Sequence, residues 1–180
     1  MLTIMDNATE PGSTAVAFAV AGVLTVGRAV IELASPAYYD PVTLLDYTAA
    51  IGSTVAWGAM AVALFFWWRI TAERRWAAFL LLAAFGVLVS SVGNLLEDVF
   101  DAGFGESLFS YGGMVGAISM MVASVVALLW WGQLRWSGLF LLGIVAGSTF
   151  PDDGGEFLTG ASLIGFGCWR WWADRAGRWI

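Results

Sequence analysis

Four long apolar segments constrain the fold of this chain more than any other feature. They cover residues 13–34, 44–68, 76–96 and 111–131. A helix needs roughly 20 mainly apolar residues to cross the hydrocarbon core of a bilayer. Because lipid offers no hydrogen-bond partners to a polypeptide backbone, such segments cross as helices that satisfy their own backbone groups. The sequence therefore predicts an all-α, polytopic membrane helix bundle.

Two shorter apolar segments follow, at residues 137–150 and 157–172. At a rise of about 1.5 Å per residue, each spans roughly 20 Å. They form either a thin hairpin or a shallow pair sheltered by the longer helices. We count them as the fifth and sixth transmembrane helices. Since no long linker or charge run interrupts the chain, residues 1–180 are predicted to form a single integral membrane domain.

Composition supports a lipid environment and excludes several chemistries. Only 12% of the residues are charged, against about 25% in a typical soluble domain. The chain has no histidine, no lysine and one cysteine, so a lysine Schiff base, a histidine-ligated metal or haem, and an intramolecular disulfide are all excluded. We therefore predict no metal and no cofactor. The net charge of −6 also argues against a nucleic-acid partner, because nucleic-acid binding needs a basic face.

The arginines predict the orientation in the membrane. Seven of the eight fall after the second or fourth segment or near the C-terminus, namely Arg69, Arg74, Arg75, Arg135, Arg170, Arg175 and Arg178. The positive-inside rule makes that side cytoplasmic. The sequence thus predicts a multi-pass protein of the cell membrane, with both termini in the cytoplasm.

Tryptophans are concentrated at the same level as these arginines. The group comprises Trp67, Trp68, Trp76, Trp130, Trp131, Trp136, Trp169, Trp171, Trp172 and Trp179. Amphipathic indole rings favour the boundary between lipid and water, so we interpret these ten as an interfacial belt. Trp57 alone lies at mid-membrane depth, where it packs in the core or lines a cavity.

Acidic residues gather on the opposite side. Ten of the fourteen lie there: Glu32, Asp40, Asp46, Glu97, Asp98, Asp101, Glu106, Asp152, Asp153 and Glu156. The simpler interpretation is that they keep the loops solvated; the functional one is an acidic vestibule that concentrates cations. The run from Asp152 to Glu156 lacks the alternating ligand spacing of a calcium loop, so we interpret it as a polar turn.

Arg28 and Glu32 are the most informative charges. They lie four residues apart on the first apolar segment and therefore share one helix face. Arg28 falls inside the hydrocarbon, where a charge is costly and is usually paired and turned inward. We predict that Arg28 pairs with Glu32 rather than extending alone towards the outer surface.

The third segment carries a matching polar stripe near its outer end. Its candidate ligand-binding residues are Asn94, Glu97 and Asp98, preceded by Ser90 and Ser91 at helical spacing. In one interpretation, Arg28 bridges Glu32 to Glu97 or Asp98 in a polar clasp that locks two helices. In the other, these residues line a pocket in which a buried carboxyl group keeps its proton.

Two further patterns concern packing. Similar residues recur in three successive hairpins, with Gly27, Gly93 and Gly147 at corresponding places, which leaves open a triplicated architecture. Gly112 and Gly116, like Gly143 and Gly147, have the spacing of close helix contacts. Such contacts form inside a bundle or between protomers, so a homo-oligomer or a partner subunit is also left open.

Three functions fit this sequence. The first is the binding or transport of a cation, a proton or a small solute at an acidic, outward-facing site that includes Arg28. The second is a membrane scaffold or accessory subunit in which an arginine–carboxylate clasp is structural. The third is a small membrane-embedded enzyme that acts on a lipid-soluble, prenyl-like substrate, with Glu97 or Asp98 as the catalytic acid. The bilayer is the one partner that the sequence requires.

Overall fold

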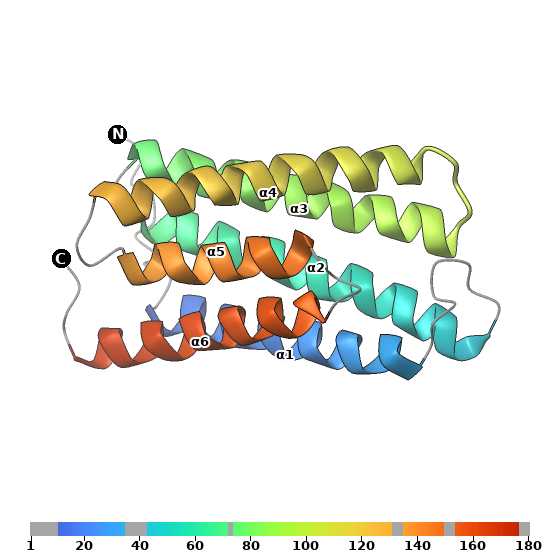
Figure 1. The fold of residues 1–180 in the computed structure, drawn as a ribbon, viewed down its shortest axis with the longest axis horizontal. Coiled ribbons are helices and arrows are strands. Elements are labelled where there is room, and N and C mark those ends of the chain that lie inside the picture. Colours follow the sequence, from blue (N-terminus) through green and yellow to red (C-terminus); the bar gives the residue numbers. More distant parts are fainter. Residues whose placement is uncertain (1–10, 35–42, 72–73, 131–134, 150–153, 177–180) are drawn as a thin grey trace, which may run out of the picture.

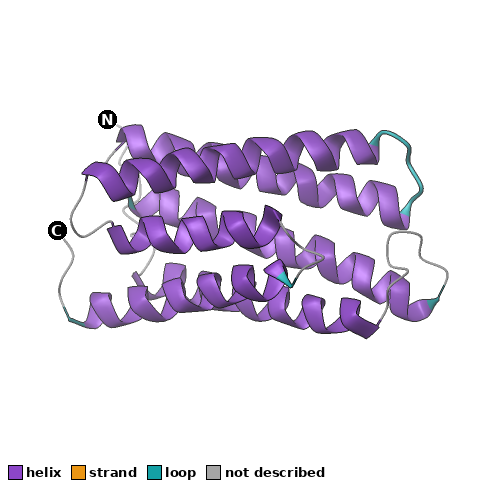
Figure 2. Ribbon diagram, viewed as in Figure 1, coloured by secondary structure: helices purple, strands orange, loops and turns teal. Residues whose placement is uncertain are grey.

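A computed structural model describes residues 11–34, 43–71, 74–130, 135–149 and 154–176, and these residues fold into helices (Figures 1 and 2). The helices are α1 (Pro11–Ala34), α2 (Leu44–Ile70), α3 (Arg74–Asn94), α4 (Gly105–Trp130), α5 (Arg135–Thr149) and α6 (Gly155–Arg175). A short π-helical turn, η1 (Leu95–Val99), continues α3. The prediction of an all-α bundle of six helices is therefore confirmed.

Four of these helices are long and apolar enough to cross a bilayer: α1, α2, α4, and α3 together with η1. These are the four segments that the sequence predicted as full spans. Many of their large apolar side chains are exposed, including Val23, Val62, Phe85 and Ile118. Apolar side chains on the outside of a bundle are expected where the surrounding solvent is lipid. The helices thus fit a membrane protein.

The helices run up and down and close into a ring. Each helix packs against the next in sequence, and α6 returns to pack against α1. Figure 1 shows that α1 begins and α6 ends at the same end of the bundle, which we call the terminal end. The opposite end, where α1 ends and α2 and α4 begin, we call the loop end.

The α5–α6 hairpin is shorter than the rest of the bundle. Figure 1 shows that α5 ends and α6 begins partway along the other helices. We call the end of α5 at Thr149 and the start of α6 at Gly155 the hairpin tip. With 15 residues, α5 is about 22 Å long, less than the roughly 30 Å of a hydrocarbon core, whereas α6, with 21 residues, is about 31 Å long. The two arrangements that the sequence left open for this pair stay predictions.

An aromatic core fills the terminal half of the ring. Phe18 of α1 packs edge-on against Phe166 of α6, with ring centroids 4.5 Å apart, and against Trp67 of α2 at 5.5 Å. Trp76 of α3 packs against Trp67, and its indole Nε1 donates a hydrogen bond of 2.8 Å to the carbonyl oxygen of Ala123 in α4. These contacts join five helices, α1, α2, α3, α4 and α6, around the bundle axis.

The predicted tryptophan belt is only partly correct. Trp136, Trp171 and Trp172 are exposed, as a belt requires, but Trp67 and Trp76 are buried in the core at 3% and 1% exposure. Their indole rings find apolar neighbours and, for Trp76, a carbonyl acceptor inside the bundle. Trp131 and Trp179 lie outside the described residues.

Glycines allow the closest helix contacts. A Cβ atom placed on Gly93 of α3 would lie 2.2 Å from the backbone nitrogen of Phe109 in α4, and one on Gly112 would lie 2.5 Å from the nitrogen of Ser90. Gly143 and Gly147 similarly bring α5 against Ser162 and Thr159 of α6. The glycine pairs that the sequence singled out thus make contacts within the bundle.

We predict that Gly93→Ala destabilises the protein by about 1–3 kcal/mol, because its methyl group would push apart two backbones that have no room to move. Gly27→Ala is the matched control, since a Cβ atom there meets nothing within 4 Å. The control should be neutral or stabilising by up to about 1 kcal/mol, because alanine is the better helix former. Thermal unfolding of purified protein in detergent measures both changes. Equal stability of the two variants would contradict this packing.

Candidate functional site

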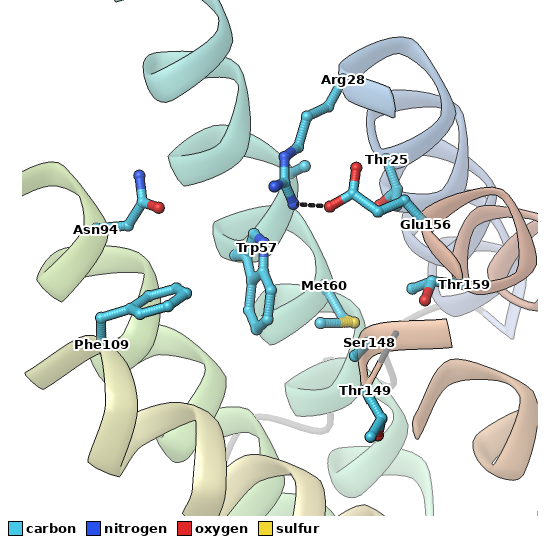
Figure 3. A pocket seen from close by; sticks show the side chains of 11 residues that line it. Thr25, Arg28, Trp57, Met60, Asn94, Phe109, Ser148, Thr149, Glu156 and Thr159 are labelled. Carbon is cyan, nitrogen blue, oxygen red and sulfur yellow. Dashed lines mark ion pairs between the residues drawn. The ribbon is translucent and has the colours of Figure 1, made fainter. Parts of the chain in front are cut away.

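The central feature of the site is a cluster of one arginine and two glutamates. Arg28 of α1 donates a hydrogen bond of 2.6 Å from Nε to Oε1 of Glu32, one turn further along the same helix. Its Nη1 forms an ion pair with Oε1 of Glu156 in α6 (Figure 3). Glu32 and Glu156 thus approach the same guanidinium from two helices. We call Arg28, Glu32 and Glu156 the carboxylate–arginine cluster.

The short hairpin explains how Glu156 reaches Arg28. Glu156 lies in the first turn of α6, after Gly154, whose φ of +81° suits glycine in the turn that begins the helix. A carboxylate is favourable at a helix N-terminus because the backbone N–H groups there are unpaired. Since the hairpin ends partway along the bundle, this turn places the carboxylate beside Arg28.

The cluster is buried. The side chains of Arg28, Glu32 and Glu156 are 8%, 14% and 7% exposed. Among the described residues, Oε2 of Glu156 has no hydrogen-bond partner. Two carboxylates that face one guanidinium leave one negative charge of the cluster unbalanced. The arrangement therefore combines an excess of negative charge with an unused acceptor.

An axial cavity of about 320 Å³ lies beside Arg28 and Glu156 of the cluster. All six helices contribute to its lining: Thr25, Arg28, Ala56, Trp57, Met60, Asn94, Phe109, Ser148, Thr149, Glu156 and Thr159. Figure 3 shows Trp57 and Met60 between the cluster on one side and Asn94 and Phe109 on the other. Of the two positions that the sequence left open for Trp57, the core or a cavity wall, the structure shows the cavity wall. The cavity is mostly apolar, with charge concentrated at one wall.

Asn94 holds one wall of this cavity in place. Its Nδ2 donates hydrogen bonds of 3.3 Å to the carbonyl oxygen of Ala50 and 3.2 Å to Oγ1 of Thr54, both in α2. Ser91, one turn earlier, donates a bond of 2.8 Å to the carbonyl oxygen of Thr54. Ser91 and Asn94 of the predicted polar stripe thus fasten α3 to α2, whereas Ser90 donates a hydrogen bond of 2.9 Å to the carbonyl oxygen of Phe109 in α4.

Glu97 and Asp98 lie apart from the residues that line the axial cavity. Both belong to η1, where the wider π-helical turn changes the helical phase on which the predicted stripe depended. Both are partly exposed, and Asp98 is an electrostatic neighbour of Arg28. The ion pair between helices that the structure shows joins Arg28 to Glu156, whereas the sequence offered Glu97 or Asp98. Neither residue is among those that line the axial cavity, and the catalytic role of Glu97 or Asp98 stays a prediction.

Other members of the acidic group have separate roles. Asp46 accepts hydrogen bonds of 2.8 Å from the backbone N–H and 2.7 Å from the hydroxyl of Thr43, and so caps the start of α2. Asp101 and Glu106 are exposed. Asp40, Asp152 and Asp153 lie outside the described residues. Among the acids of this group that the structure describes, only Glu32 and Glu156 enter the cluster.

Comparison with known proteins adds no assignment. No protein-family model matches the chain, and no match was found among curated proteins or solved structures. The function is therefore inferred from the geometry of the carboxylate–arginine cluster and its cavity.

We predict that Arg28→Ala destabilises the protein by about 3–5 kcal/mol, because it leaves two buried carboxyl groups without their cation. Arg69→Ala is the control: it removes an exposed arginine of α2 and should change stability by less than about 0.5 kcal/mol. Thermal unfolding in detergent compares the two variants. A melting temperature for Arg28→Ala equal to that of Arg69→Ala would show that the cluster does not stabilise the fold.

Proposed function

We propose that this protein binds a small cation in its axial cavity, with Glu156 as the principal ligand. The observation that carries the proposal is the charge imbalance of the buried cluster, in which two carboxyl groups face one guanidinium. A fixed negative charge in a cavity with low-dielectric walls concentrates cations. A cation beside Glu156 balances the negative charge of the second carboxylate.

The remaining walls favour an organic cation. Trp57 and Phe109 present aromatic rings in a T-shaped contact, with centroids 5.9 Å apart, and both line the cavity. The face of an aromatic ring attracts a cation, tryptophan most strongly. A metal ion would instead need several oxygen ligands, and the described residues contain no group of three or more acidic or other typical ligand side chains suited to one. A substituted ammonium group therefore fits the site best.

The cavity faces outward in this proposal. The loop end lies opposite the arginine-rich end, which the positive-inside rule places in the cytoplasm. The aromatic core around Phe18, Trp67 and Phe166 fills the terminal half of the bundle axis. A solute would therefore bind from outside, and transport would need that core to open.

We predict that tetramethylammonium binds to the protein reconstituted in lipid nanodiscs, and that Glu156→Gln weakens binding at least about tenfold, because the variant lacks the carboxylate. Glu106→Gln is the control, since Glu106 is exposed and lies outside the cavity lining. Isothermal titration calorimetry measures both affinities. The affinity should also fall as the pH is lowered, since protons compete for the carboxylates. Equal binding by wild type and Glu156→Gln would rule out the site.

A structural clasp is the competing function, because the cluster joins α1 to α6. In that case Glu156→Gln, whose amide oxygen can still accept a hydrogen bond from Arg28, would keep the fold and show no ligand-dependent difference from wild type. Stabilisation of wild type, but not Glu156→Gln, by tetramethylammonium in a thermal unfolding assay would favour binding over the clasp.

We further predict the orientation of the bundle. Green fluorescent protein fused after Ile180 should fluoresce and alkaline phosphatase fused there should be inactive, because that end is cytoplasmic in this proposal. Fusions truncated at Gly103, between α3 and α4, should show the reverse. The opposite pattern would place the cavity on the cytoplasmic side.

A further inference from the structure

A second cavity adjoins the first. This lateral cavity has a volume of about 280 Å³ and lies between α4 and the end of α5. It shares Trp57, Phe109, Ser148 and Thr149 with the axial cavity. The two cavities therefore meet at the Trp57–Phe109 contact.

The shortness of α5 leaves the lateral cavity uncovered. α5 ends at Thr149, whereas α4 begins at Gly105, nearer the loop end, and Figure 1 shows α4 extending beyond the hairpin tip. Ser110 and Met114 of α4 line the lateral cavity, and both are exposed. In a bundle surrounded by lipid, an exposed side of a spanning helix faces the hydrocarbon. The lateral cavity is thus an opening from the bilayer towards the cluster.

The lining of the lateral cavity differs from that of the axial one. Its walls away from the shared residues are Val87, Met114, Ala117 and Met120, with Ser90, Ser110 and Gly113 as the small or polar members. None of its lining residues is charged. Methionine side chains adapt to flexible apolar ligands. The lateral cavity therefore suits an alkyl chain, and the axial cavity beside Glu156 suits a cationic head.

We propose that the ligand is an amphipathic organic cation that enters sideways from the bilayer, with its ammonium group beside Glu156 and its alkyl chain in the lateral cavity. This inference rests on the proposed function and names the class of ligand. Each cavity alone is at or below the lower end of the range for small-molecule sites, about 300–1,000 Å³, whereas the two together fall within it. The negative charge of the cluster favours a cationic head group, and the uncharged lateral cavity beside α4 favours an alkyl chain.

The test compares decyltrimethylammonium with tetramethylammonium in nanodiscs, with empty nanodiscs subtracted to remove partitioning into lipid. Ala117→Phe places a ring in the lateral cavity, and Val115→Phe, two residues earlier on the exposed side of α4, is the matched control. We expect Ala117→Phe to weaken decyltrimethylammonium binding at least about tenfold, since each excluded methylene group weakens it several-fold. It should leave tetramethylammonium binding unchanged, and Val115→Phe should alter neither.

The outcomes separate the two proposals. If neither ammonium ion depends on Glu156, the proposed function fails. If tetramethylammonium binding depends on Glu156 but decyltrimethylammonium binds Ala117→Phe and wild type alike, the cation site stands and the lateral cavity is not its entrance. Ser110→Phe, at the exposed rim of the same cavity, repeats the test if Ala117→Phe does not fold, and an unchanged affinity there overturns the inference equally.

Discussion

The ion pair between Arg28 of α1 and Glu156 of α6 joins the first helix of the ring to the last. A guanidinium inside the hydrocarbon needs a partner, because lipid cannot solvate it. The partner comes from α6, which lies beside α1 through close contacts between Gly22 and the backbone of Gly160 and Ile164. Packing of small residues and pairing of charges thus act on the same two helices. Together they fix the first helix of the chain against the last.

The point at which the α5–α6 hairpin turns determines how far along the bundle Glu156 lies. A hairpin as long as the other helices would carry its acidic turn to the loop end, where water would screen the charge. The short hairpin brings Glu156 into the bundle and also leaves the outer part of α4 uncovered. One structural feature therefore produces the buried carboxylate, the axial cavity and the lateral opening. Below the hairpin tip, the aromatic core keeps the bundle axis closed.

Patterns within one segment predicted the features that depend on that segment alone, such as helix spans and pairs of residues on one helix. The four full spans, the short fifth helix and the pairing of Arg28 with Glu32 follow from apolar length and from four-residue spacing on one helix. The sixth helix is longer than predicted and continues to Arg175. Asn94 was predicted to lie on the polar stripe of the third segment, and its hydrogen-bond partners are on α2. Glu156 was noticed only as part of an acidic turn, because spacing along one segment cannot show the depth at which a later hairpin ends. The η1 turn was missed for a similar reason, since no residue pattern marked the change from 3.6 residues per turn.

The buried tryptophans show why composition alone cannot locate an aromatic residue across a bundle. Trp67 and Trp68 are neighbours in sequence and lie at nearly the same depth, yet Trp67 is 3% exposed and its neighbour is only partly buried. Successive residues on a helix point about 100° apart, so one ring turns to the axis and the next turns away. Which face is inward depends on the closed order of the six helices. The same order places Trp57, ten residues earlier on α2, in the wall between the two cavities. The indole ring of Trp57 therefore lines both the axial cavity, which has the charged wall, and the lateral cavity, which is uncharged.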